Sequence, residues 1–95
     1  MYRLTIRKGA QKTIARQSRP VREQMTSEID RLEADPDDPM LGVERLVGGP
    51  EGRLRFKGPA HRFRAIFVRD DVERTLDVRT IGPRGEVYQP RRRRR

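Results

Sequence analysis

The chain has 95 residues, a formal net charge of +9, 33% hydrophobic and 39% charged residues, and no cysteine. This length predicts one domain with one modest core. The lack of cysteine excludes disulfide bridges and cysteine-based zinc sites, and a single histidine excludes a histidine-rich metal site. No apolar run is long enough for a secretion signal or a membrane span, so we expect a cytoplasmic protein without a metal or cofactor.

The first residues predict a short strand and a short helix. Apolar and polar residues alternate over residues 2–7, which is typical of a half-buried strand. Gly9 is expected to interrupt the pattern. Residues 10–16 then predict a short helix that turns Ala10 and Ile14 inward.

A second, longer helix is expected after Ser18, which we predict to cap it, with Pro20 in its first turn. It should end near Asp35, because Pro36 disfavours helix in the residue before it. Its apolar stripe consists of Val21, Met25, Ile29 and Leu32. Its opposite, charged face is predicted to carry Glu23, Glu28 and Arg31.

The C-terminal half predicts strands at about residues 52–57, 61–69 and 74–81, with a last short strand at Val87–Tyr88. The residues expected to face the core are Leu54, Phe56, Phe63, Ala65, Phe67, Leu76 and Val78. Strands grouped apart from helices predict an α+β fold, in which two helices cover one face of an antiparallel sheet of three to four strands. This single domain would span 1–89, and the basic tail 90–95 would be disordered.

Positive charge is concentrated in the same half. Residues 1–44 contain eight basic and eight acidic residues, so the whole excess of +9 lies in residues 45–95. Arg91–Arg95 supply five of these charges. Such a distribution favours a nucleic-acid partner, an acidic protein partner, or both.

Basic residues also alternate with apolar ones on two neighbouring strands, on either side of a Gly58–Pro59 turn. A period of two places them together on the sheet face away from the core. Cations side by side in a sheet repel each other, unless an anion such as a polyphosphate chain lies between them. A merely solvated sheet face is the competing interpretation. The predicted cationic face consists of Arg53, Arg55, Lys57, Arg62 and Arg64.

Four motifs together carry a family resemblance: RLVGG, GRLRFKG, HRFRAIFVRDD and LDVRTIGPRGEVY. They resemble the RelE/ParE superfamily of bacterial toxin–antitoxin toxins, and the likeness covers residues 2–88. RelE-type members of that superfamily enter the ribosomal A site and cleave mRNA, whereas ParE-type members inhibit DNA gyrase. The short N-terminal helices resemble the RelE type more, because gyrase-directed relatives have a longer helical hairpin.

The resemblance also implies site residues. Arg53 and Arg55 match two lysines of the basic strand, and Arg64 matches the arginine of the next strand. Arg84 and Tyr88 match a second arginine and the terminal tyrosine. The implied catalytic residues are therefore Arg64, Arg84 and Tyr88, and the implied RNA-binding residues are Arg53, Arg55, Lys57 and Arg62. Two departures are the arginines in place of lysines and the absence of a histidine near Tyr88.

RNA cleavage by the substrate's own 2′-hydroxyl needs a base, cations for the phosphorane oxygens and an acid for the leaving 5′-oxygen. Arginine suits the second task but is a poor base, because it stays protonated in proteins. Tyr88 is the candidate base, if nearby cations lower its pKa, and Glu86 is the alternative. Arg84 is the candidate for the leaving-group acid and would act on the 5′-oxygen more by its charge than by proton transfer. His61 is expected at a turn. Tyr88 could instead simply close the core with its hydroxyl at the rim.

The implied partners are the ribosome, with contacts to 16S rRNA, the mRNA, and a cognate acidic antitoxin that folds on binding. A gyrase inhibitor without nuclease activity is the alternative function. A third alternative is a toxin-like fold that has lost its activity and only binds a partner.

Overall fold

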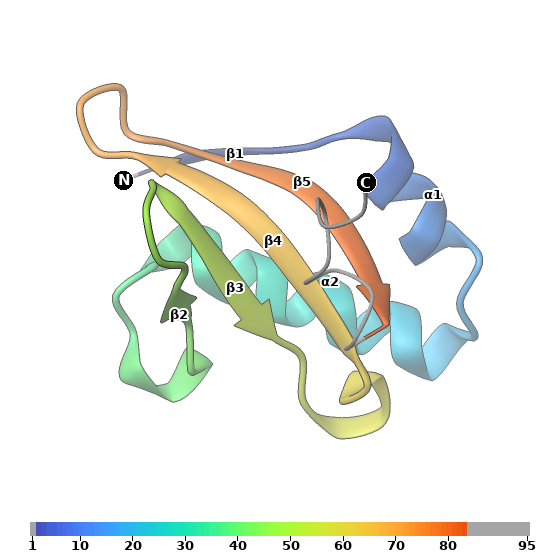
Figure 1. The fold of residues 1–95 in the computed structure, drawn as a ribbon. Coiled ribbons are helices and arrows are strands. Elements are labelled where there is room, and N and C mark those ends of the chain that lie inside the picture. Colours follow the sequence, from blue (N-terminus) through green and yellow to red (C-terminus); the bar gives the residue numbers. More distant parts are fainter. Residues whose placement is uncertain (1, 84–95) are drawn as a thin grey trace, which may run out of the picture.

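The computed structural model describes residues 2–83, which form an α+β fold of two layers (Figure 1). Its elements in chain order are β1 (Arg3–Ile6), α1 (Lys8–Ala15), α2 (Arg19–Ala34), the 3-10 helix η1 (Pro39–Leu41), β2 (Glu44–Arg45), β3 (Glu51–Arg55), the 3-10 helix η2 (Gly58–Ala60), β4 (Phe63–Asp70) and β5 (Thr75–Pro83). The predicted fold class is confirmed. The predicted strand at Val87–Tyr88 and the tail at 90–95 lie outside the described residues.

The sheet has five strands in the order β1-β5-β4-β3-β2. The meander from β3 to β5 is antiparallel, as predicted. Strand β2, which was not predicted, pairs antiparallel with β3, and β1 joins parallel to β5 and makes the sheet mixed. A parallel neighbour needs a long crossover between the two strands, and the chain from α1 to β4 supplies it. In this register Leu4 lies opposite Leu76 and Ile6 opposite Val78, so β1 extends the apolar face of β5.

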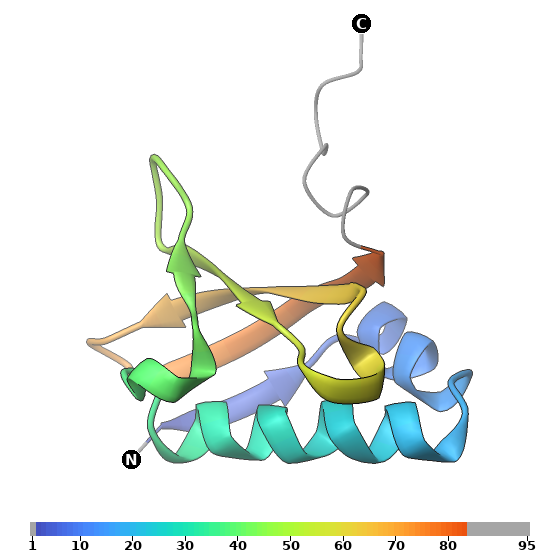
Figure 2. The same ribbon diagram turned by 90° about the horizontal axis from the view of Figure 1, so that it is seen from below.

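Helix α2 lies along one face of the sheet, and α1 packs against β5 (Figure 2). The predicted stripe of α2 is confirmed, because Met25, Ile29 and Leu32 are buried and Val21 is partly buried against them. Each fully buried apolar side chain of this size contributes about 1.5–3 kcal/mol. The predicted inward residues of the strands are confirmed in the same core, which includes Leu54, Phe56, Ala65, Phe67, Leu76 and Val78, with Phe63 packed against it.

Both helix starts differ in detail from the prediction. Helix α1 begins at Lys8 and includes Gly9, because a glycine in the first turn interrupts few hydrogen bonds. Ser18 does occupy the N-cap of α2, but its side chain makes no capping hydrogen bond. Its main-chain carbonyl instead accepts from the amide of Arg22 at 2.9 Å. Within residues 2–83, no helix is long and apolar enough to cross a membrane.

The prediction that Glu28 lies on the charged, outer face of α2 is wrong. Glu28 is only 2% exposed, because η2 packs over this flank of the helix. Its Oε2 accepts a hydrogen bond from the main-chain amide of Lys57 at 2.8 Å and another from the side chain of Gln24. Helix α2 therefore has a second buried flank, which an apolar stripe alone does not indicate.

The hairpin between β3 and β4 is shorter than predicted. Strand β3 ends at Arg55 and β4 begins at Phe63, so Lys57 and Arg62 lie outside the strands. The cause is η2, where Gly58 adopts a φ of +58° that other residues rarely tolerate. The alternation of side chains along β3 therefore determines the direction of Arg53 and Arg55 but not that of Lys57.

Strand β5 contains an irregularity at its centre. Ile66 of β4 lies opposite Thr80, but the next residue, Phe67, lies opposite Val78. Arg79 is thus the extra residue of a β-bulge, which shifts the alternation by one position. As a result, Val78 and Ile81 both face the core although three positions separate them.

Candidate nucleic-acid interface

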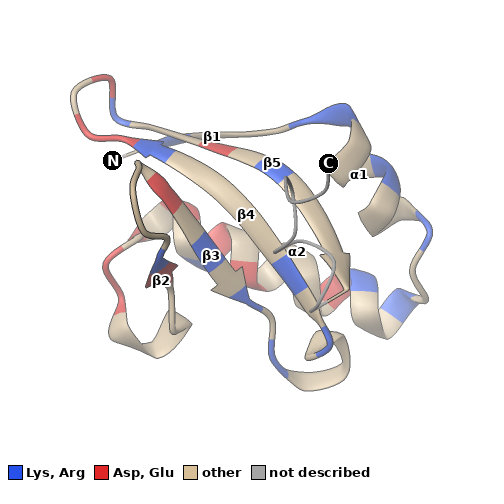
Figure 3. Cartoon of the chain, viewed as in Figure 1, with Lys and Arg blue, Asp and Glu red and all other residues tan. Residues whose placement is uncertain are grey.

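The sheet face opposite the helices carries the basic residues of β3 and β4. Leu54 is completely buried on the helix side, so its neighbours Arg53 and Arg55 point to the open face. The antiparallel register places Arg55 directly opposite Arg64. Figure 3 shows basic bands on both strands, β3 and β4. The predicted juxtaposition of cations across this hairpin is confirmed for this pair.

Arg64 is the most buried of the predicted site cations within residues 2–83, with 8% of its surface exposed. Its Nη1 donates to two main-chain carbonyls, those of His61 at 2.6 Å and Phe63 at 2.8 Å. These two bonds therefore fix the direction of Arg64 beside Arg55.

Arg53 has a different environment from Arg55. It lies opposite Glu44 of β2, and the two side chains form an ion pair. Only 11% of the Arg53 side chain is exposed. The sequence did not reveal this partner, because β2 is two residues long and has no alternating pattern. Glu44 reduces the charge that Arg53 offers to an anion.

Lys57 and Arg62 lie at the two ends of η2 and are exposed. The Lys57 ammonium donates to the main-chain carbonyl of Met40, in η1. The Arg62 guanidinium lies 5.8 Å from the centroid of the Phe63 ring, a cation–π distance. The hairpin thus brings Arg53, Arg55 and Arg64 onto one sheet face, whereas Lys57 and Arg62 flank its end.

His61 occupies the turn, as predicted, and its Nδ1 lies 3.3 Å from the carbonyl of Gly58. Three further candidates, Arg84, Glu86 and Tyr88, lie outside the described residues. Their roles stay predictions. Among residues 2–83, no group of three or more His, Cys, Asp or Glu could hold a metal ion.

Asp77 of β5 is a carboxylate that several donors surround, and the sequence did not indicate this role. Arg7 binds it through Nη2 at 3.0 Å, and Arg79 lies 3.5 Å away. Thr5 of β1 donates to the same carboxylate at 3.3 Å. The hydrogen bond from Arg7 holds the pKa of Asp77 below its usual range. Asp77 therefore ties β1 and the start of α1 to β5.

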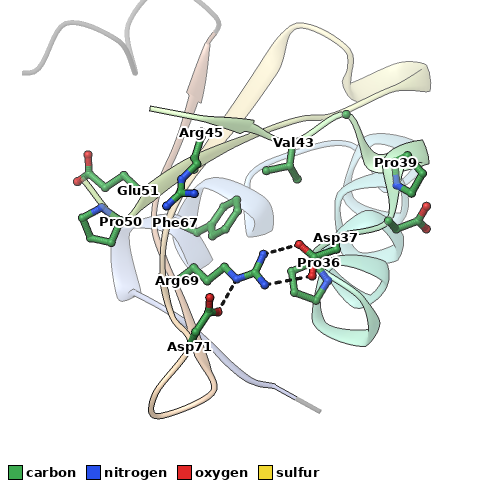
Figure 4. Close-up of a pocket in the computed structure, with 13 residues that line it drawn as sticks. Pro36, Asp37, Pro39, Val43, Arg45, Pro50, Glu51, Phe67, Arg69 and Asp71 are labelled. Atoms are coloured by element: carbon green, nitrogen blue, oxygen red, sulfur yellow. Dashed lines mark hydrogen bonds and ion pairs between the residues drawn. The ribbon is translucent and has the colours of Figure 1, made fainter. Parts of the chain in front are cut away.

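A pocket of about 450 Å³ lies at the opposite end of β4, between the chain after α2 and the β2–β3 hairpin (Figure 4). Phe67 and Val43 form its apolar part, and Arg45 points into it (Figure 4). Gly52 borders the Phe67 ring closely, because an added Cβ would lie 2.7 Å from Cζ of that ring. The pocket therefore depends on a glycine in β3.

Arg69 forms one wall of this pocket and is bound by carboxylates. Asp37 accepts two hydrogen bonds from it, at 2.8 and 3.1 Å, and Asp71 accepts a third at 2.7 Å (Figure 4). The Tyr2 hydroxyl accepts from Arg69 at 3.0 Å and donates to Asp71 at 2.7 Å. These bonds raise the pKa of Arg69 and lower the pKa of both carboxyl groups. Arg69 is therefore a structural residue that closes the sheet against the chain after α2.

The described residues thus form a mixed five-stranded sheet with helices on one face and basic residues of β3 and β4 on the other. No protein-family profile matches the chain, and no curated protein sequence matches it significantly.

Solved structures match it closely in fold. The RelE–RelB complex from Pyrococcus horikoshii OT3 superposes with a TM-score of 0.71 at 22% identity, over 90% of this chain and 97% of that chain. The isolated E. coli RelE toxin gives 0.69 at 20% identity, over 95% and 94%. The intact E. coli RelBE toxin–antitoxin complex gives 0.68 at 18% identity, over 87% and 96%. The chain thus has the RelE fold over nearly its whole length.

Proposed function

We propose that this protein is the toxin of a type II toxin–antitoxin pair and acts as a ribosome-dependent endoribonuclease on mRNA in the A site. The observation that carries the proposal is the Arg55–Arg64 pair on the open face of a RelE-type sheet. Two adjacent guanidinium groups repel each other, and a phosphate between them removes that repulsion. Nη1 of Arg64 is already held by two carbonyls, so little side-chain freedom is lost when phosphate binds.

The reaction in this proposal is attack of the substrate's 2′-hydroxyl on the adjacent phosphate, which breaks the bond to the 5′-oxygen and leaves a cyclic phosphate. Arg64 stabilises the charge that develops on the phosphorane oxygens, and Arg55 binds the neighbouring phosphate. Tyr88 or Glu86 takes the proton of the 2′-hydroxyl, and Arg84 stabilises the leaving oxygen. The ribosome contributes the alignment of the mRNA, which is a large part of the barrier in such reactions.

The proposed antitoxin is an acidic segment that folds across this protein. Two of the matching structures are complexes of RelE with RelB, which supports a protein partner of this kind. The net charge of +9 favours an acidic chain, and complementary charge would make association fast and salt-sensitive. Its carboxylates would compete with mRNA for Arg55 and Arg64.

In vitro translation followed by primer extension tests the proposal. The wild-type protein should produce cuts at fixed codon positions in the presence of ribosomes and none on naked mRNA. Arg64→Ala, purified in the same way, is the matched control and should give much weaker cuts. Inhibition of DNA supercoiling by gyrase without any mRNA cut would instead support the alternative function. The absence of both effects would leave a toxin-like fold that only binds a partner.

A further inference from the structure

Glu28 is a buried carboxylate that the proposed chemistry does not use. It lies in the middle of α2 and is 2% exposed. Burial of a carboxylate is costly unless hydrogen bonds compensate it. Oε2 receives such bonds from the Lys57 amide and the Gln24 side chain, but Oε1 accepts none from residues 2–83. A side chain that served packing alone would not need this charge.

The amide bound by Glu28 begins the turn that leads to Arg64. Lys57 is the N-cap of η2, and its carbonyl accepts from the amide of Ala60 at 3.2 Å. The amide of His61 donates to the carbonyl of Gly58 at 3.1 Å and completes the turn. The carbonyl of His61 then accepts from Nη1 of Arg64 at 2.6 Å. Glu28 thus binds the first residue of this turn, two hydrogen bonds hold the turn itself, and its last residue binds the guanidinium on the sheet.

The turn also lies tightly against α2. Gly58 has a φ of +58°, and a Cβ at this position would lie 3.1 Å from Oε1 of Gln24. Gln24 in turn donates to Glu28, so these two helix residues lie against the first two residues of the turn, Lys57 and Gly58. A charged acceptor binds a main-chain amide more strongly than a neutral one. The turn is therefore held at its first residue by the strongest acceptor nearby.

We propose that Glu28 is a positioning residue for Arg64. It anchors the turn formed by residues 57–61, and the His61 carbonyl at the end of that turn sets the direction of the Arg64 guanidinium. The inference rests on the proposed function in so far as Arg64 acts on the scissile phosphate. A small displacement of such a group is enough to slow a reaction, because misplacement by about 1 Å can cost about a hundredfold.

The test compares Glu28→Ala, Glu28→Gln and Leu32→Ala in single-turnover cleavage on ribosomes. Glu28→Ala should lower the rate constant at saturating protein by about tenfold or more, with little change in the half-saturating concentration. Glu28→Gln should restore the rate to within about threefold, because its amide oxygen can accept from the Lys57 amide. Leu32→Ala removes a buried side chain from the same helix and should leave the rate of the folded protein unchanged.

A second readout does not depend on cleavage. The NMR signal of the Arg64 Nε–H group should shift or broaden in Glu28→Ala but not in Leu32→Ala. If the wild-type protein does not cleave mRNA, the proposed function fails, and this signal alone decides the inference. Wild-type rate and an unchanged Arg64 signal in folded Glu28→Ala would refute it.

Gly58→Ala keeps the test decisive if Glu28→Ala does not fold. The added methyl group would press against Gln24 and push the turn away from α2, while the Glu28 carboxylate stays in place. Gly58→Ala should lower the cleavage rate and shift the NMR signal of Arg64, as expected for Glu28→Ala. A folded Gly58→Ala protein with neither effect would also refute the role of the turn.

Discussion

The two ends of β4 each carry a buried or half-buried arginine, and the two are held in different ways. Arg64 lies on the open face, and its Nη1 is bound by main-chain carbonyls. Arg69 follows five positions later and therefore lies on the helix side, where Asp37 and Asp71 bind it. The carboxylates neutralise the Arg69 guanidinium, and the carbonyls orient Nη1 of Arg64. The groups that accept hydrogen bonds from each arginine are thus a better guide to its function than the number of arginines in the strand.

The largest effect is expected from Arg64→Ala on cleavage. Loss of a donor that acts mainly in the transition state costs about 3 kcal/mol, or roughly a hundredfold in rate. The measurement is single-turnover cleavage of ribosome-bound mRNA at saturating protein, with ribosome binding measured separately. A rate within error of the wild type would show that Arg64 does not act in the reaction, and the functional contrast between Arg64 and Arg69 would then be wrong.

Arg69→Met should act on stability instead. It removes the hydrogen bonds to two carboxylates and to the Tyr2 hydroxyl, and we expect a loss of about 1–2 kcal/mol, kept small by solvent screening at this partly exposed site. Urea unfolding at neutral pH gives the value. The cleavage rate of the folded variant should equal that of the wild type, and a large rate loss would mean that the pocket end of β4 also takes part in function.

The contribution of Arg69 should also depend on pH. The pKa of Asp37 and that of Asp71 are lower in the folded protein than in the unfolded chain, so the unfolded chain binds protons first as the pH falls. The stabilisation is complete above the unfolded values near pH 4 and is lost as the pH falls through the folded values. The difference in unfolding free energy between wild type and Arg69→Met should therefore shrink below about pH 4. A difference that stays constant from neutral to acidic pH would contradict the carboxylate clamp.

The smallest effect separates Arg53 from Arg55 on β3. Because Glu44 pairs with Arg53, we expect Arg53→Ala to slow cleavage by about threefold and Arg55→Ala by about tenfold. Both variants can be measured in the cleavage assay used for Arg64→Ala. Equal losses would show that the ion pair with Glu44 opens when mRNA binds.

Periodicity in the sequence was sufficient to predict the fold class and the core residues of β3, β4 and α2, because these residues repeat at the spacing of their element. It did not indicate the buried Leu41 and Ala60 of the 3-10 helices, or Ile81 beyond the bulge of β5. It also predicted that the cations of two neighbouring strands lie side by side, and Arg55 and Arg64 do so. It could not identify the partner of Arg53, because a strand of two residues has no period. Nor could it show that Glu28 is buried, because the turn that covers it is distant in the chain.

The pocket end of β4 was equally inaccessible to sequence reasoning. Arg69 and Asp71 are close in sequence, but Tyr2 and Asp37 reach them only through the tertiary fold. The roles implied for Arg84 and Tyr88 came from a resemblance, and these residues lie outside the described range. The candidate site on the sheet is therefore best defined at the Arg55–Arg64 pair.

The central claim, that the open face of this sheet cleaves mRNA through the substrate's own 2′-hydroxyl, is tested most directly with a modified message. A reconstituted translation system would present the A-site codon either as natural RNA or with a 2′-deoxy sugar at the scissile position. The account predicts cleavage of the natural message on ribosomes, and binding without cleavage of the modified one. Cleavage of the 2′-deoxy message, or equal cleavage of the natural message without ribosomes, would contradict it.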